Sequence, residues 1–118
     1  MRSPTKIDSL EILRREGLNP TTIFDVGGGT KGTDCLFLNF SDKRTIIIEP
    51  TESHKDTLVD SMMTRGVKDY ELVVNRVGIE DTEDTVKLST IAKEKDCEPS
   101  YLIKVDVDGG DLDVCKGC

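Results

Sequence analysis

The sequence is poor in aromatic and basic residues. It has no tryptophan, two tyrosines, three phenylalanines and one histidine in 118 residues. With so few rings, the base-stacking platforms of single-strand-binding proteins are not expected. Lys and Arg number 16 against 23 Asp and Glu, which gives a net charge of −7. Because phosphate backbones are bound by clustered Lys and Arg, the composition argues against a nucleic-acid partner and suits a ligand that carries positive charge.

Long apolar runs are absent as well. No segment approaches the ~20 apolar residues that a membrane-spanning helix needs. The first ten residues, MRSPTKIDSL, have no apolar core of the kind found in secretory signals. We therefore expect no membrane partner and a cytoplasmic location, with reduced cysteines.

No metal site is expected either. Cys115 and Cys118 have C-x-x-C spacing, but Cys35 and Cys97 are isolated in the sequence, so a zinc ribbon is not predicted. Cys115 is expected to be a small buried apolar residue. The stretch DVDGGD at 106–111 has glycine where a calcium loop needs Asp or Asn, and no glutamate closes the loop.

Short runs rich in β-branched residues alternate with segments of helical periodicity. The runs predict strands at 22–26, 44–50, 70–77 and 101–107. Five helices are predicted before, between and after these strands. The first follows a capping box at 5–8 and carries Leu10 and Leu13. The second carries Cys35, Leu36 and Leu38; the third carries Leu58, Val59, Met62 and Met63; the fourth covers 88–96; and the fifth begins at 108. This alternation requires right-handed crossovers and a mostly parallel sheet, which is a Rossmann-like doubly wound α/β fold.

The predicted strand order is 3-2-1-4, with all strands parallel and the fourth strand at an edge. At 118 residues the chain is expected to form one domain at most. An uncovered apolar edge invites pairing with another chain. Self-association through the fourth strand is therefore expected.

The stretch TIFDVGGGTKGTD, residues 22–34, places glycines directly after the first predicted strand. Gly27, Gly29 and Gly32 fit G-x-G-x-x-G, a turn at which the backbone comes close to a nucleotide. Glu49 ends the second predicted strand, 22 residues after Gly27, where a carboxylate can accept hydrogen bonds from ribose hydroxyls. These spacings fit both a nicotinamide dinucleotide and S-adenosylmethionine.

The charge of Asp25 separates the two ligands. A dinucleotide would set a pyrophosphate on the turn, where a neighbouring carboxylate repels it. S-adenosylmethionine has no phosphate and offers an ammonium and a sulfonium group. We therefore expect Asp25 and the turn glycines at the methionyl end of S-adenosylmethionine. A turn-capping carboxylate is the alternative role for Asp25.

Three motifs resemble the FkbM family of S-adenosylmethionine-dependent methyltransferases: IFDVGGGTKG, IIIEP and YLIKVDVDGGDLDVCKG. The resemblance runs from about Ile7 to the last residue, and the third motif is the most specific. It implies methylation of a hydroxyl oxygen on a sugar-like or small-molecule acceptor. Members of the family continue for several more strands, so residues 1–118 are expected to be the N-terminal part of such a domain.

Two residues complete the predicted site. Ile79 follows the third strand, in the segment that flanks adenine in similar methyltransferases, and is expected to pack on the base with Glu80 or Asp81 near the exocyclic amine. A plain loop is the alternative. Asp106 ends the fourth strand and is predicted to be a general base, or to orient the acceptor. His54 is expected to be exposed on the second helix.

Two other functions stay open on sequence grounds. One is a fragment of a nicotinamide-dependent oxidoreductase, against which the charge of Asp25 argues. The other is a non-catalytic, truncated module that binds the cofactor poorly or not at all and acts through a partner.

Overall fold

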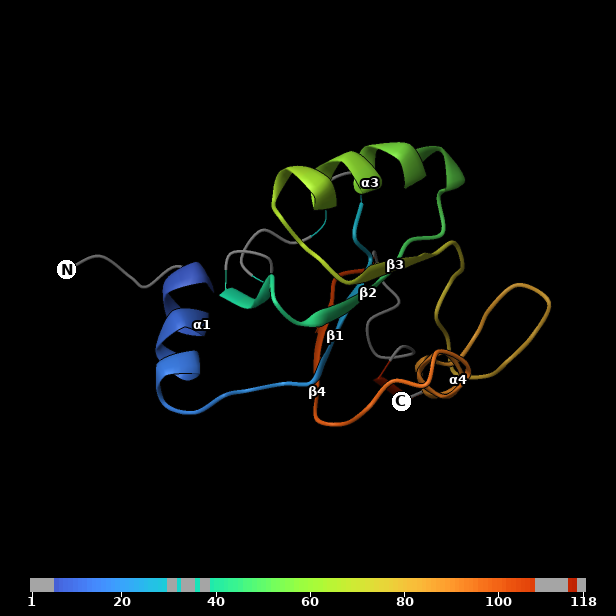
Figure 1. The fold of residues 1–118 in the computed structure, drawn as a ribbon. Coiled ribbons are helices and arrows are strands. Elements are labelled where there is room, and N and C mark those ends of the chain that lie inside the picture. The colour runs from blue at the N-terminus through green and yellow to red at the C-terminus, as the bar shows by residue number, and fades with distance from the viewer. Residues whose placement is uncertain (1–5, 30–31, 33–35, 37–38, 108–114, 117–118) are drawn as a thin grey trace.

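The computed structural model describes residues 6–29, 32, 36, 39–107 and 115–116. Figure 1 shows an open sheet with helices on both of its faces. The elements are α1 (Lys6–Arg15), β1 (Thr22–Val26), β2 (Arg44–Ile48), the 3-10 helix η1 (Glu52–His54), α3 (Lys55–Thr64), β3 (Tyr70–Val73), α4 (Leu88–Glu94) and β4 (Tyr101–Val105).

The four strands form one parallel sheet in the order β3-β2-β1-β4. This confirms the Rossmann-like α/β fold and the strand order predicted from the sequence. β1 and the apolar part of β2 are buried on both faces, as central parallel strands require. The chain leaves β1 toward β2 on one side and reaches β4 on the other, so the sheet has its topological switch point between β1 and β4.

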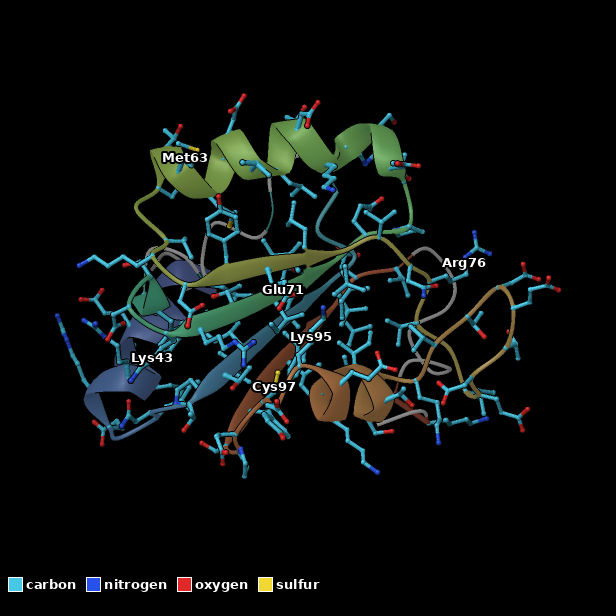
Figure 2. All side chains as sticks on the ribbon, turned by 45° about the vertical axis from the view of Figure 1, so that its right-hand side comes forward. Lys43, Met63, Glu71, Arg76, Lys95 and Cys97 are labelled. Atoms are coloured by element: carbon cyan, nitrogen blue, oxygen red, sulfur yellow. The ribbon has the colours of Figure 1, made fainter. Side chains whose placement is uncertain are left out.

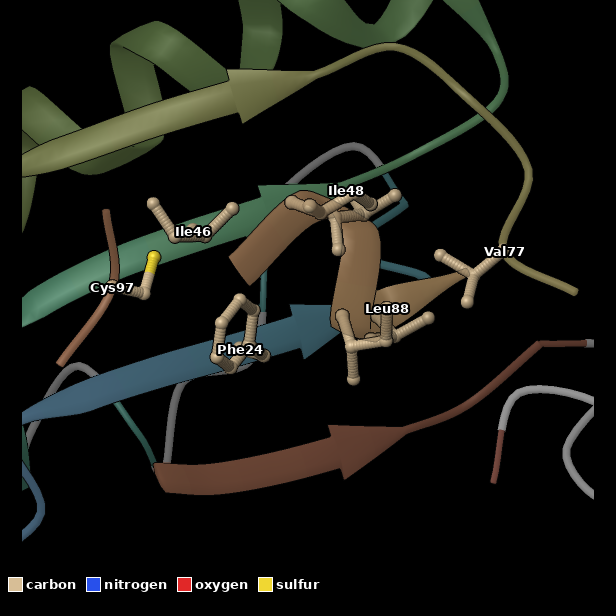
Figure 3. Close-up of a cluster of buried hydrophobic side chains, with 8 residues drawn as sticks. Phe24, Ile46, Ile48, Val77, Leu88 and Cys97 are labelled. Atoms are coloured by element: carbon tan, nitrogen blue, oxygen red, sulfur yellow. The ribbon is translucent and has the colours of Figure 1, made fainter. Parts of the chain in front are cut away.

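Side chains alternate across the sheet and build two cores. Ile23 and Ile47 face α3 and pack with its Leu58 and Met62. The opposite face packs against α4, and Figure 3 shows that core, with Cys97 at one end beside Ile46. Its main members are Phe24, Val26, Ile46, Ile48, Val77, Leu88 and Ile91.

Three strands end earlier than predicted. β2 ends at Ile48 rather than 50, β3 at Val73 rather than 77, and β4 at Val105 rather than 107. After β3, the Asn75 side-chain oxygen accepts a hydrogen bond of 2.8 Å from the Arg76 amide, a local bond that competes with the strand ladder. The early ends leave polar residues beyond the carboxyl edge of the sheet, where ligands bind in such folds.

The helices predicted around Leu10 and Leu13, around Leu58 to Met63 and over 88–96 are present as α1, α3 and α4, but not all their apolar residues face the core. Leu10 packs against the first cluster, whereas Leu13 is 50% exposed because α1 lies at the side of the sheet. Met63 is 67% exposed and points away from the sheet in Figure 2. No helix in the described ranges is long and apolar enough to cross a membrane.

The structure contradicts the prediction for one cysteine, Cys115, and does not describe two others. Cys115 is exposed, so the prediction of a buried apolar residue is wrong. Leu36 is helical and buried, as the periodicity predicted. Thr5 of the capping box, Cys35, Leu38, Cys118 and the helix start at 108 lie outside the described residues.

Candidate ligand-binding cavity

A cavity of about 1000 Å³ lies at the carboxyl ends of the strands. Four segments line it. They are the turn after β1 at Val26, Gly27 and Gly29, the end of β2 from 48 to 51 together with His54, the loop after β3 from 75 to 80 with Thr82 and Thr85, and Asp106 with Val107 after β4. The cavity thus sits at the switch point between β1 and β4.

Five of the residues predicted from the sequence meet at this cavity: Gly27, Gly29, Glu49, Ile79 and Asp106. They come from four segments that are far apart in the chain. The sequence therefore predicted which end of the sheet carries the cavity. Two other predicted residues, Asp25 and Gly32, do not line it.

Gly27 marks a point of close backbone contact between β1 and β4. Its φ is +86°, and a Cβ placed on it would lie 2.1 Å from the Asp106 carbonyl oxygen. The Asp106 amide also donates to the Val26 carbonyl at 3.0 Å. Only glycine combines this φ with this approach, which explains the first glycine of the motif.

The glycine amides of the turn are already used within the protein. Each of the four that the structure describes donates one hydrogen bond. The acceptors are the Ile48 carbonyl for Gly27 (2.8 Å) and Gly28 (3.4 Å), Glu49 Oε1 for Gly29 (3.2 Å), and the Gly28 carbonyl for Gly32 (2.8 Å). Among these glycines, no amide is left to cradle a phosphate, and a carboxylate lies against the turn instead.

Glu49 is 9% exposed and is held by backbone donors on both oxygens. Oε1 accepts from the Gly29 amide (3.2 Å) and Oε2 from the Thr51 amide (3.0 Å), while His54 Nδ1 lies 3.3 Å from Oε2. Burial by itself raises the pKa of Glu49, but these hydrogen bonds and the nearby imidazole outweigh it, so the pKa is lowered. The ionised carboxylate keeps lone pairs for further donors, such as two adjacent hydroxyls.

The lowered pKa of Glu49 predicts a pH dependence of stability. A carboxyl with a depressed folded-state pKa contributes stability above its unfolded pKa, here 4.5, and loses it as the pH falls through the folded-state pKa. The difference in free energy of unfolding between wild type and Glu49→Gln should therefore be constant above about pH 5.5 and shrink below 4.5. Urea unfolding from pH 3 to 7 measures it; a gap unchanged down to pH 3 would contradict the assignment.

Asp25 lies beneath the turn rather than in the cavity. Its side chain is fully buried, and Oδ1 is 3.7 Å from Lys104 Nζ, which also lies 3.5 Å from Asp106 Oδ2. Asp25 and Lys104 are register partners on β1 and β4. The place that the sequence assigned to a ligand's positive charge is thus taken by a lysine, and the predicted contact of Asp25 with a ligand is not part of this cavity.

The cavity also contains residues that sequence reasoning missed or misplaced. His54 was expected to be exposed, but it belongs to η1, is one-third exposed, and lies beside Glu49. Thr82 and Thr85 also line the cavity, and no role was predicted for them from the sequence. Thr51, which was not singled out from the sequence, donates hydrogen bonds to Glu49 from its backbone amide and also from its side chain.

No family model, curated protein or solved structure matches the chain. Within the described ranges, no group of three or more His, Cys, Asp or Glu is placed to hold a metal ion. The resemblance to FkbM methyltransferases therefore stays at the level of the motifs.

Proposed function

We propose that the cavity binds S-adenosylmethionine and that the chain is, or is part of, a methyltransferase acting on a hydroxyl oxygen of a sugar-like or small-molecule acceptor. The observation that carries the proposal is the bonding of the glycine turn. Its described amides are satisfied internally, and the Glu49 carboxylate occupies the position beside Gly29.

This bonding favours a nucleoside without phosphates. A pyrophosphate on the turn needs free backbone amides, whereas each described glycine amide of the turn already donates a hydrogen bond within the protein. A ribose diol needs acceptors, and an ionised carboxylate held by two backbone donors offers them without further ordering. The bonded amides of the turn, rather than the charge of Asp25, therefore disfavour a nicotinamide dinucleotide.

The loop after β3 is suited to contact the base. Ile79 lines the cavity and is 44% exposed, which leaves an apolar surface for the face of an adenine ring. Glu80 lines the same wall and can accept a hydrogen bond from the exocyclic amine. These two residues therefore take the predicted role at the base.

Asp106 lies where an acceptor would approach. Its side chain is 74% exposed at the end of β4, and Lys104 Nζ lies 3.5 Å from Oδ2. When bound, the cofactor would supply a methyl group activated by its sulfonium charge. Asp106 would hold the acceptor hydroxyl in line or take its proton, and positioning of this kind supplies much of the acceleration in a displacement reaction.

The Glu49→Gln variant tests the ribose assignment. Loss of the charge-assisted hydrogen bonds should weaken binding of S-adenosylhomocysteine by about 1.5–3 kcal/mol, measured by isothermal titration calorimetry at pH 7.5. Glu52→Gln is the matched control, because Glu52 is an exposed acid on η1 outside the cavity lining. Equal affinities of wild type and Glu49→Gln would remove Glu49 from the site.

A further inference from the structure

One loop supplies a large part of the cavity wall. Residues 77–86, which we call the cavity loop, include six lining residues: Val77, Gly78, Ile79, Glu80, Thr82 and Thr85. The loop joins β3 to α4 and is closed at its base by a bridge between Val77 and Val86. Its position relative to the turn and to Glu49 sets the width of the cavity.

The cavity loop is bonded mainly to itself. Near its tip, Thr85 Oγ1 donates to the Glu80 carbonyl at 2.9 Å, and the hydroxyls of Thr82 and Thr85 lie 2.8 Å apart. Between its ends only Gly78 is buried, and residues 79–84 are exposed. Burial of apolar side chains therefore holds the two ends in place but does not hold the segment that carries Ile79 and Glu80.

Asp81 connects that segment to a fixed element. Its Oδ1 accepts from the Lys87 amide at 2.9 Å and its Oδ2 from Thr90 Oγ1 at 2.8 Å. Both donors belong to the start of α4, which is anchored in the core by Leu88 and Ile91. The hydrogen bonds from the Lys87 backbone and Thr90 lower the pKa of Asp81, so both bonds persist at neutral pH.

We propose that Asp81 is a positioning residue, which fastens the cavity loop to α4 and so holds Ile79 and Glu80 at the ligand. The sequence left Glu80 and Asp81 as equal candidates for contact with the base. The structure distinguishes the two residues. Each carboxylate oxygen of Asp81 accepts a hydrogen bond from the start of α4, outside the cavity, whereas Glu80 lines the cavity. The inference rests on the proposed function for the identity of the ligand.

Calorimetric titration of four variants with S-adenosylhomocysteine tests the positioning role. Asp81→Ala should lower affinity roughly tenfold, and Thr90→Val by a smaller factor, because it removes one of the two bonds. Asp81→Asn should restore most of the affinity, since its carbonyl can accept from Lys87 and its amide can donate to Thr90. Asp84→Ala, an exposed acid on the same loop that is absent from the cavity lining, should match wild type.

A second ligand distinguishes positioning from direct contact. S-inosylhomocysteine carries a carbonyl oxygen in place of the exocyclic amine of adenine. If Asp81 positions the loop, Asp81→Ala should lower the affinity for both ligands by the same factor. If Asp81 contacts the amine, the substitution should lower the affinity only for S-adenosylhomocysteine. A loss confined to the adenine ligand, or unchanged affinity in Asp81→Ala, would overturn the proposal.

Hydrogen exchange of the ligand-free protein tests the role of Asp81 without any ligand. Asp81→Ala should speed exchange of the Lys87 amide and of the cavity loop, whereas Asp84→Ala should not. Unchanged exchange in Asp81→Ala overturns the inference even if no ligand is bound. Failure of wild type to bind S-adenosylhomocysteine, with the exchange result as expected, would instead count against the proposed function alone.

Discussion

Replacing Gly27 with alanine is expected to lower the free energy of unfolding by about 2–5 kcal/mol. A left-handed φ costs a non-glycine residue ~1–2 kcal/mol, and Gly27 has φ +86°. The added Cβ would also lie 2.1 Å from the Asp106 carbonyl oxygen, so β1 and β4 must separate, and such overpacking adds ~1–3 kcal/mol. Urea unfolding measures the loss.

Gly29→Ala is the matched control for Gly27→Ala. Gly29 lies in the same turn and also has a left-handed φ, +63°, but a Cβ there meets nothing within 4 Å. Gly29→Ala should therefore lower the free energy of unfolding only by the ~1–2 kcal/mol that a left-handed backbone costs a non-glycine residue. Equal losses in the two variants would mean that the contact with Asp106 does not determine the identity of residue 27.

The second large effect is expected for Lys104→Met, at about 2–4 kcal/mol in the free energy of unfolding. The substitution removes the cation beside Asp25, a carboxylate whose side chain is fully buried, and a buried charge that loses a partner is costly. Lys104 itself is 23% exposed, so water screens part of the interaction and the loss falls short of that of a fully enclosed pair. Thermal and urea unfolding report it.

Lys95→Met provides the comparison for Lys104→Met. Lys95 Nζ lies only 2.6 Å from Glu71 Oε1, but the two side chains are 33% and 40% exposed. Figure 2 shows this pair, with Lys95 and Glu71 side by side. Exposed pairs contribute ~0–1 kcal/mol despite short distances. If Lys95→Met costs as much as Lys104→Met, burial of Asp25 is not the reason for the effect.

The fold could be predicted because few topologies satisfy the pattern. β-branched runs alternating with helical segments demand parallel strands, and right-handed connections with a glycine turn after the first strand leave the observed order. Strand ends were not predictable in the same way. β3 ends at Val73, close to Asn75, whose side chain competes for backbone hydrogen bonds, but the β-branched Val74 and Val77 lie beyond this end and extended the predicted run.

The candidate site was predicted in part, for a similar reason. Gly27 and Glu49 could be placed at the cavity because each directly follows the end of a strand. Alternation along β1 places Asp25 on the same face as Ile23, which indicates burial, but its partner Lys104 follows only from the register of β1 with β4. No sequence pattern predicted the contact of His54 with Glu49, because that contact depends on the path of the chain from β2 into η1.

Other expectations stay predictions. They include the FkbM resemblance, the acceptor class, the cytoplasmic location and self-association through β4. β4 lies at an edge of the described sheet, with Tyr101 and Ile103 exposed, which agrees with the edge expected for the fourth strand.

The central claim is that the cavity binds a nucleoside without phosphates, with Glu49 at the ribose and a glycine turn whose described amides are bonded within the protein. Calorimetric titration of the wild-type protein with S-adenosylhomocysteine and, separately, with NAD⁺ tests it most directly. We expect binding of S-adenosylhomocysteine, and no binding of NAD⁺ at the same concentrations, because the described glycine amides that a pyrophosphate would need are already bonded within the protein. Binding of NAD⁺ with equal or higher affinity would contradict the account.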